Sequence, residues 1–505
     1  MVGNLERRAA IRDLSTGVTM SELMASRAND ANPDPWPPEL RFEETSDPCT
    51  DAANAQRFAL QFGRDLLFVD PWGWMRWDGN CWREGKQYAN RCAQELGAVI
   101  RNESIAESVS ASNTEMGRSA RDSAQKNAEA LLKWAKVSES LQRIEAALKL
   151  ASSHIYVKSS EMDRHPWLLN CANGTLDLHS GELQPARRHD LITKSTHVAY
   201  DPAAKCPTFD KAIFDVCCGD RDLVRYLQRL FGYCLTGNNS EQKMFIFNGS
   251  GANGKDTTLT AVQHAMGDYA GLAAPGLLIQ THNERHPTEV ADLAGMRLAI
   301  ASESNEQGRL NEVAVKRYVG SEKLKARLMR QDFFDFPVQF KLILMTNHRP
   351  VIAGDDYGIW RRLNLVPFNA TFKGENRDKN LPTKLDKELP GILRWCVEGC
   401  MEWQRAGLDP PEIVRQATDQ YKADQDILRD FFAENCVFKP TAQVTSKALF
   451  RRYQDWCDDN GERAKSLKWL WPKLQERGVC KERMRDGTLY RGIGLIHAEE
   501  PERYS

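Results

Sequence analysis

The chain contains 505 residues, of which 41% are hydrophobic and 27% are charged, and its formal net charge is -1. One ordinary core does not extend over this length, so we expect about three domains of ~150 residues each. The near-zero net charge excludes a uniformly basic nucleic-acid-binding protein. A nucleic-acid partner would have to be bound by local basic patches.

The sequence predicts that residues 1–52 form a flexible leader. They are polar and include a proline-rich run from Asn32 to Pro38 that resists regular structure. They lack the apolar stretch of a secretory signal, and no segment of the chain approaches the length of a membrane span. The 13 cysteines show no paired metal-ligand spacing. We therefore expect reduced thiols, a cytoplasmic location in a bacterial or host cytosol, and no membrane partner.

Residues 53–240 predict an α+β domain. An aromatic, strand-like stretch around Trp72 and Trp77 precedes a long helical region, a hairpin signal at 168–178 and further helices. Aromatic residues in alternation form core more often than they stack on bases. We therefore assign no chemistry to this domain.

Residues 241–372 alternate strands and helices in the manner of a parallel α/β sheet, whose ligands bind at the carboxyl ends of the strands. An apolar strand from Phe245, a glycine-rich loop and a helix start follow the P-loop spacing. Glycines let backbone N–H groups converge on phosphates, and a lysine reaches their outer oxygens. The residues expected to bind ATP are Gly249, Gly251, Asn253, Gly254, Lys255, Asp256 and Thr257.

The expected Mg²⁺ site departs from the usual P-loop pattern. Asp256 occupies the position that normally carries a Ser or Thr ligand. A carboxylate binds Mg²⁺ but also repels phosphates, so we expect the hydrolysis rate, more than nucleotide binding, to be affected. Thr257 or Asp256 is expected to make the metal contact. Glu303, at the end of the next apolar strand, is expected to hold Mg²⁺ or orient water, with Glu306 as the alternative.

Two further polar features predict catalytic roles. Asn347 ends the apolar strand from Phe340 and is expected to sense the terminal phosphate or position water. Arg361 and Arg362 offer guanidinium groups that could reach a phosphate across a subunit boundary, where they would stabilise transition-state charge. A solvated basic pair is the alternative interpretation.

A basic cluster predicts contact with DNA. Between Lys316 and Arg330 lie six basic residues and one acidic residue. Side chains of this kind follow the phosphate backbone without reading bases. The expected contacts are Lys323, Lys325, Arg327 and Arg330, and a solvated charged face is the alternative.

The last 133 positions predict a helical segment, 373–435, and a winged-helix-like DNA-binding domain, 436–505. Two amphipathic helix patterns around 449–456 and 466–475 precede a hairpin turn at 485–488. The second helix and the basic hairpin are expected to grip duplex DNA. A protein–protein module is the alternative.

Together these motifs resemble those of superfamily 3 helicases, and more narrowly the helicase portion of phage and plasmid primase-helicases, related to the poxvirus primase-helicase. The resemblance covers about residues 55–495. It rests on Gly249 to Thr257, Ala301 to Glu303, Asn311 to Lys316 with Gly320, Ala326 with Arg327, Phe340 to Pro350, Gly358 to Arg362, and the segment from Leu389. It implies an AAA+-like ATPase, a hexameric ring around DNA and 3′ to 5′ translocation. Asp256 departs from the family pattern, and the primase domain of many relatives has no room here.

The sequence therefore predicts an ATP-dependent replicative DNA helicase of a phage, plasmid or integrated element. It would use ATP and Mg²⁺, bind single-stranded and duplex DNA, and form a homo-oligomer. A separate primase or replication initiator is a candidate partner. One alternative is a nucleotide-switched initiator or loader without robust unwinding, which Asp256 favours. The other is a full primase-helicase.

Overall fold

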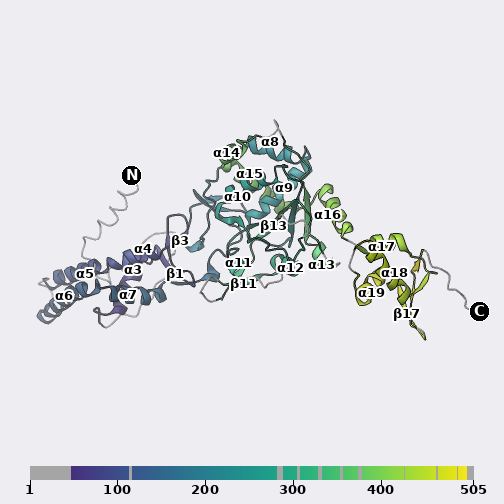
Figure 1. Ribbon diagram of the computed structural model, residues 1–505. Coiled ribbons are helices and arrows are strands. Elements are labelled where there is room, and N and C mark those ends of the chain that lie inside the picture. The colour runs from purple at the N-terminus through teal and green to yellow at the C-terminus, as the bar shows by residue number, and fades with distance from the viewer. Residues whose placement is uncertain are drawn as a thin grey trace, which may run out of the picture.

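The computed structural model describes ten segments of the chain, and their elements form an elongated arrangement (Figure 1). The described residues are 47–112, 117–280, 288–303, 308–327, 333–352, 357–373, 378–425, 427–461, 464–485 and 487–496. Helices α3–α7 lie at one end, the largest sheet lies in the middle, and α17–α19 lie at the other end. Most of the expected leader, residues 1–46, lies outside the described residues.

The amino-terminal region, residues 47–240, begins with helices packed beside a small sheet of order β3-β2-β1-β4. Thr50 starts α3 by accepting a hydrogen bond from the Ala53 N–H. Trp82 is fully buried, and Trp74 packs edge-on against Phe58 and Phe68, so the aromatic stretch contributes to core as expected. The elements are α3 (Asp51–Phe62), β1 (Leu66–Asp70), β2 (Gly73–Trp77), β3 (Trp82–Glu84), α4 (Lys86–Gln94), α5 (Leu96–Ala111), α6 (Arg118–Ser138), α7 (Leu141–His154) and β4 (Tyr156–Lys158).

A second part of this region leads into the central sheet. The expected hairpin is confirmed, because β5 and β6 pair antiparallel from Leu168↔Asp177 to Cys171↔Gly174. Asp220 caps α9, because its side chain accepts hydrogen bonds from the N–H groups of Asp222 and Leu223. The elements are η2 (Ser159–Glu161), β5 (Leu168–Cys171), β6 (Gly174–Asp177), β7 (Leu183–Gln184), η3 (Arg188–Asp190), α8 (Pro207–Val216) and α9 (Arg221–Leu235).

The central sheet has the order β14-β8-β13-β10-β9, and every pairing in it is parallel. This confirms the parallel α/β sheet that the alternation of strands and helices predicts. The elements are β8 (Met244–Asn248), α10 (Lys255–Met266), η4 (Gly267–Tyr269), β9 (Ala270–Leu272), α11 (Thr288–Ala291), β10 (Leu298–Glu303), α12 (Glu312–Gly320), β11 (Lys323–Arg327), β12 (Phe333–Pro337), β13 (Lys341–Thr346), α13 (Tyr357–Trp360) and β14 (Leu363–Pro367).

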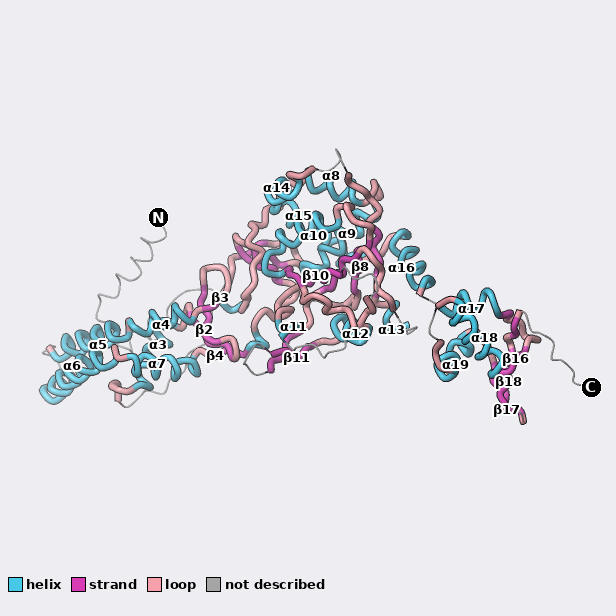
Figure 2. The backbone as a smooth tube through the Cα atoms, in the orientation of Figure 1, coloured by secondary structure: helices cyan, strands magenta, loops and turns pink. Residues whose placement is uncertain are grey.

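Strand β8 divides the hydrophobic residues around the sheet into two cores. Phe245 and Phe247 face one core, whereas Met244 and Ile246 face the other, and all four are at most 1% exposed. Successive residues of a strand point to opposite faces, so a strand covered on both sides is apolar throughout. Figure 2 shows α9, α10 and α15 (Leu389–Ala406) on one side of β8 and β10, with α11 and α12 on the other.

Two close contacts hold the amino-terminal region and α15 against the sheet. Helices α9 and α15 cross at Gly232, where an added Cβ would lie 2.0 Å from the backbone nitrogen of Cys400. Two buried basic side chains donate hydrogen bonds to carbonyl groups at the carboxyl end of α9. Arg297 donates to the Leu235 carbonyl at 2.5 Å, and Lys341 donates to the Thr236 carbonyl. Burial lowers the pKa of Lys341 to about 7.

The remaining elements are the helices α14 and α16 and those of a small carboxy-terminal region, residues 427–496. A three-stranded antiparallel sheet of order β16-β18-β17 and the β15–β19 pair accompany three helices there. None of the described helices combines the length and hydropathy that crossing a bilayer requires. The elements are α14 (Leu381–Asp386), α16 (Glu412–Asp424), α17 (Ile427–Asn435), β15 (Cys436–Val437), β16 (Gln443–Thr445), α18 (Ser446–Asp459), α19 (Leu467–Glu476), β17 (Cys480–Met484), β18 (Gly487–Arg491) and β19 (Gly494–Leu495).

Candidate functional site

The glycine-rich loop joins the carboxyl end of β8 to the amino end of α10, and backbone geometry explains its glycines. Gly251 and Gly254 have φ values of +90° and +77°, which glycine adopts without the cost that a Cβ imposes. At Gly249 an added Cβ would lie 2.4 Å from the Phe368 carbonyl oxygen. The buried Asn253 amide donates to the same carbonyl at 3.3 Å. The loop is therefore held against the segment that follows β14.

Lys255, the first residue of α10, is turned back toward the strand ends. Its Nζ donates to the carbonyls of Gly249 (3.3 Å) and Thr346 (3.1 Å) and to Asn347 Oδ1 (3.1 Å). The side chain is buried, and burial lowers the pKa of Lys255, although the nearby Asp256 charge opposes the shift. Its hydrogen-bond partners among the described residues are all neutral oxygens, so no described carboxylate forms an ion pair with the ammonium group.

This contact joins residues that the sequence placed in separate motifs. The backbone of Glu303 lies opposite Thr346 in the β10–β13 pairing, so the ends of β8, β13 and β10 converge beside Lys255. Parallel strands end at one edge of a sheet, and this edge is where ligands bind in open α/β sheets. The alternative acidic residue, Glu306, lies outside the described residues.

A cavity of about 810 Å³ adjoins the loop on the side of α8 and α14. Ligand pockets for small molecules have volumes of roughly 300–1,000 Å³. Its apolar wall comes from both helices and from Phe372, and its polar rim from the loop and the start of α10. The lining residues are Pro207, Thr208, Lys211, Ala212, Asp215, Val216, Ala252, Asn253, Gly254, Asp256, Thr257, Thr258, Phe372, Asp378, Lys379, Leu381, Pro382, Lys384 and Leu385.

The expected metal-binding residues offer oxygen ligands without forming a cage. Asp256 is exposed, Thr257 is half-buried, and both line the cavity. Among the described residues, no three His, Cys, Asp or Glu side chains gather to hold a metal ion. Mg²⁺ in nucleotide sites keeps several waters and takes one or two protein ligands plus phosphate oxygens. The donor set therefore fits Mg²⁺ that arrives with a nucleotide.

Arg361 and Arg362 lie at the opposite edge of the sheet. They directly precede Leu363, which pairs with Met244 at the amino end of β8. The five residues of β8 separate them from the loop by roughly 16 Å at ~3.3 Å per residue. Arg362 Nη1 donates to the Gly358 carbonyl at 2.6 Å, whereas Arg361 is exposed. The structure does not bring either arginine to Lys255 of the same chain.

The predicted DNA contacts lie on the antiparallel β11–β12 hairpin. Leu324 and Ala326 are buried, so Lys323, Lys325 and Arg327 occupy the outer face. Lys325 Nζ and Arg327 Cζ each lie 5.3 Å from the ring centroid of Phe333, which is 51% exposed. Lys323 pairs with Pro337 at the base of the hairpin, and Arg330 lies outside the described residues.

Sequence reasoning missed Phe333. The alternation of β12 was its available signal, because Phe334 and Phe336 face the core and Phe333 must then point outward.

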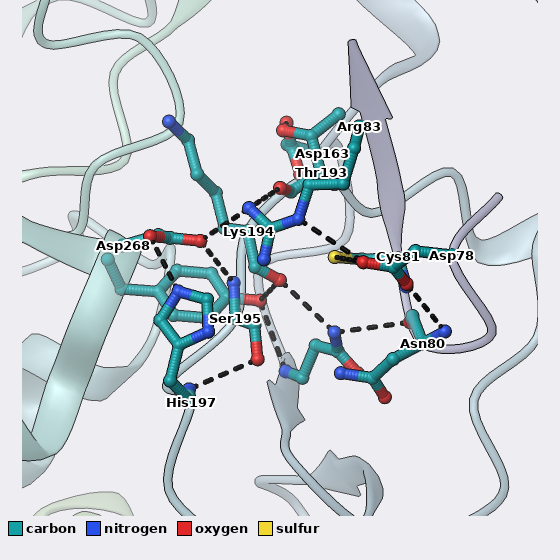
Figure 3. Close-up of polar contacts among 12 residues, drawn as sticks. Asp78, Asn80, Cys81, Arg83, Asp163, Thr193, Lys194, Ser195, His197 and Asp268 are labelled. Atoms are coloured by element: carbon teal, nitrogen blue, oxygen red, sulfur yellow. Dashed lines mark hydrogen bonds and ion pairs between the residues drawn. The ribbon is translucent and has the colours of Figure 1, made fainter. Parts of the chain in front are cut away.

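Sequence reasoning also missed a polar junction at the far end of α10 (Figure 3). Asp268, just beyond the helix, accepts hydrogen bonds from Arg83 Nη1 (2.8 Å) and the Ser195 N–H (3.1 Å), and His197 Nε2 lies 2.9 Å away. Burial acts to raise the pKa of Asp268, but the bonds from Arg83 and His197 outweigh it and hold the pKa below its ordinary value. The helix that carries Lys255 is thus anchored to the amino-terminal region.

The fold and the site define a class: a mixed α/β protein with a parallel sheet and a lysine-bearing, glycine-rich loop at the carboxyl edge of that sheet.

Comparison with known proteins narrows this class. Residues 55–218 match the family described as D5 N terminal like. A candidate helicase of Acanthamoeba polyphaga mimivirus is 26% identical over 327 residues, covering 59% of this chain and 34% of the relative. A candidate helicase of Frog virus 3 is 26% identical over 284 residues, covering 51% of this chain and 28% of the relative. Residues 55–218 thus resemble the D5 N terminal like family, and the chain is similar to viral candidate helicases over about half of its length.

The chain spans about a third of the length of the curated relatives it matches. A candidate helicase of Invertebrate iridescent virus 6 is 25% identical over 317 residues. Among solved structures, the apo form of the NrS-1 C-terminal region is similar with a TM-score of 0.38 and 12% identity, covering 59% of this chain and 78% of that one.

Proposed function

We propose that the chain is an ATP-dependent replicative DNA helicase of a phage, plasmid or integrated element, with its ATP site at the loop around Lys255. The observation that carries this proposal is the contact of Lys255 Nζ with Asn347 Oδ1 and the Thr346 carbonyl, beside a cavity of about 810 Å³. A cation held by neutral oxygens can exchange them for phosphate oxygens, which form stronger, charge-assisted hydrogen bonds. The N-cap residue of α10, Gly254, has no side chain, and the Lys255 N–H makes a long bond of 3.4 Å to Asn253 Oδ1, so the N–H groups of the first turn also favour an anion.

Each residue of the site then has a separate task. Lys255 and the N–H groups of the loop hold the β- and γ-phosphates, and the cavity beside the loop accepts the nucleoside. Glu303 orients the attacking water, and Asn347 releases Lys255 and responds to the γ-phosphate. Asp256 or Thr257 would hold Mg²⁺, with Glu303 as a further candidate ligand, and the ion would neutralise phosphate charge when bound.

An arginine from an adjacent subunit completes the site in this proposal. The separation of roughly 16 Å between the arginine pair and the loop supports action across a subunit boundary in a ring. Arg361 is the stronger candidate because it is exposed, whereas Arg362 is tied to the Gly358 carbonyl. A guanidinium supplied in this way stabilises charge that develops during phosphoryl transfer.

The hairpin and the carboxy-terminal region supply DNA contacts in the same proposal. Lys325 and Arg327 would follow the phosphate backbone of a single strand, and the exposed Phe333 ring would stack on a base. In the carboxy-terminal region, α19 and the basic β17–β18 hairpin would bind duplex DNA as a winged-helix-like unit. Deleting residues 436–505 should abolish duplex binding and leave ATPase activity intact; retained duplex binding would contradict this assignment.

The central experiment compares the parent chain with Lys255→Ala. The parent should bind ATP with Mg²⁺, hydrolyse it faster with single-stranded DNA, and unwind a duplex with a 3′ tail. Lys255→Ala should lose hydrolysis and unwinding, while DNA binding at low salt persists. Lys136→Ala is a control, because Lys136 is an exposed lysine of α6 that lies outside the cavity lining and the loop. Parent and Lys255→Ala proteins that behave alike would refute the assignment.

A nucleotide-switched initiator or loader is the second candidate function. Asp256, which lines the cavity where a P-loop normally presents a hydroxyl, favours slow turnover. Such a protein would bind ATP tightly and hydrolyse it slowly, with no stimulation by single-stranded DNA. Stimulated turnover together with unwinding would decide for the helicase.

A further inference from the structure

Asp256 places a carboxylate beside the glycine-rich loop, where its charge acts on the adjacent Lys255. It is the second residue of α10, it is exposed, and it lines the cavity beside the loop. Its carboxylate makes no hydrogen bond or ion pair within the described part of the chain. The nearest cation along the chain, Lys255, is directed to neutral oxygens on the strand ends.

The other two aspartates of the cavity differ from Asp256 in this respect. Asp215 accepts from Lys211 Nζ at 2.5 Å, and Asp378 accepts from Lys384 Nζ at 2.7 Å. Each of these carboxylates therefore has a cation beside it, although both pairs are exposed to solvent. Among the aspartates that line the cavity, Asp256 is the one without a lysine bonded to it, and it lies at the point where the phosphates are expected to arrive.

We propose that Asp256 makes nucleotide binding conditional on a divalent cation, so that this chain rejects metal-free ATP and accepts the Mg²⁺ complex. The inference rests on the proposed function. A carboxylate next to the phosphates repels a metal-free triphosphate, because like charges at short range oppose each other. The same carboxylate is a hard oxygen ligand of the kind that Mg²⁺ takes together with phosphate oxygens. A Ser or Thr at this position would offer a neutral ligand and impose no such penalty.

The consequence is a larger ratio between two dissociation constants. The Kd for ATP in excess EDTA, divided by the Kd in excess Mg²⁺, measures how strongly binding depends on the metal. Removing the charge of Asp256 should tighten metal-free binding and weaken or leave unchanged the binding of the Mg²⁺ complex. A lower Kd without metal lowers the ratio of the two dissociation constants, and a higher Kd with Mg²⁺ lowers it further.

The test is titration calorimetry of the full chain with ATP in both buffers. For Asp256→Asn the ratio should fall at least tenfold below that of the parent, which corresponds to ~1.4 kcal/mol. Asp256→Ser, which restores the usual hydroxyl, should fall similarly and provides a second variant if the amide disturbs folding. Asp222→Asn is the matched control, because Asp222 is likewise the second residue of a helix, α9, and lies outside the cavity lining. Its ratio should stay within twofold of the parent.

An unchanged ratio in Asp256→Asn, with Mg²⁺-dependent ATP binding intact, would overturn this inference and leave the proposed function standing. A thermal melt of the same variants reports the other role of a carboxylate in the first turn of a helix, which is to stabilise the helix through its dipole. A lower Tm with an unchanged ratio would assign Asp256 to that role alone and also overturn the inference. Failure of the parent chain to bind ATP with Mg²⁺ would refute the proposed function itself.

Discussion

Asp268→Asn should loosen the helix that carries Lys255, and its effect can be estimated from the junction. The substitution removes the ion pair between Arg83 and Asp268, whose side chains are 32% and 28% exposed, and weakens the bonds from Ser195 and His197. Pairs at this exposure contribute up to ~1 kcal/mol, and hydrogen bonds to a charged group contribute somewhat more. We expect a loss of roughly 1–2 kcal/mol of unfolding free energy, or about 1–2 °C in Tm for a chain of 505 residues at ~2.1 cal/mol/K per residue.

The assay combines a double-mutant cycle with hydrogen exchange. Arg83→Met, Asp268→Asn and the double variant should show a coupling energy of ~0.5–1 kcal/mol, because each single change removes the same pair. Amide exchange should accelerate at the carboxyl end of α10 in all three. Additive effects of the two substitutions, or unchanged exchange in α10, would refute the view that this junction anchors the helix.

The junction also has a defined dependence on pH. The pKa of Asp268 is lowered in the folded chain, so the unfolded chain binds more protons as the solution is acidified. The stabilisation is fully present above the unfolded pKa of ~3.9 and is lost as the pH falls through the folded value. The stability difference between parent and Asp268→Asn should therefore be constant from neutral pH to about pH 5 and narrow below pH 4. A difference that disappears near pH 7 would mean that another group controls the junction.

Two further predictions concern the ring and the hairpin. Arg361→Ala and Lys255→Ala proteins, each inactive alone, should recover part of the parent ATPase rate when mixed, because some interfaces then combine an intact arginine with an intact loop; no recovery at any mixing ratio would contradict a shared site. Lys325→Ala should reduce the salt slope of single-stranded DNA binding by about 1, and Phe333→Ala should cost ~1–3 kcal/mol of affinity. Lys323→Ala at the hairpin base should change the salt slope less than Lys325→Ala, and equal effects would argue for a diffuse basic face.

The features predicted well from the sequence were those with a strong local signal. Continuous apolar runs such as Met244 to Phe247 indicated buried parallel strands, because a strand covered on both faces leaves no polar positions. Lys255 and Asn347 each follow such a strand, and parallel strands end at a common edge, so their contact follows from the topology.

The features that were not predicted depend on residues far apart in the chain. Arg83 and Asp268 are separated by 185 positions, and neither has a neighbour in sequence that signals the pair. The cavity was not predicted either. Helix α8 precedes the strands of the central sheet in the sequence and α14 follows them, so no local pattern links the two helices that line the cavity. Arg297 and Lys341 read as ordinary basic residues, although both are buried and donate to carbonyls at the end of α9. Charge alone does not reveal such caps.

The crossing of α9 and α15 at Gly232 limits how the molecule can be dissected. Both helices belong to the hydrophobic cluster that covers Phe245 and Phe247, yet one precedes β8 and the other follows β14. A fragment trimmed to residues 241–372 would keep α10 on that face of the sheet but lose α9 and α15, and it should aggregate, since large exposed apolar patches promote association. Shortened versions meant for biochemistry or crystallisation should therefore start before Asp220 and continue past Gly407, keeping the two helices and the sheet in one polypeptide.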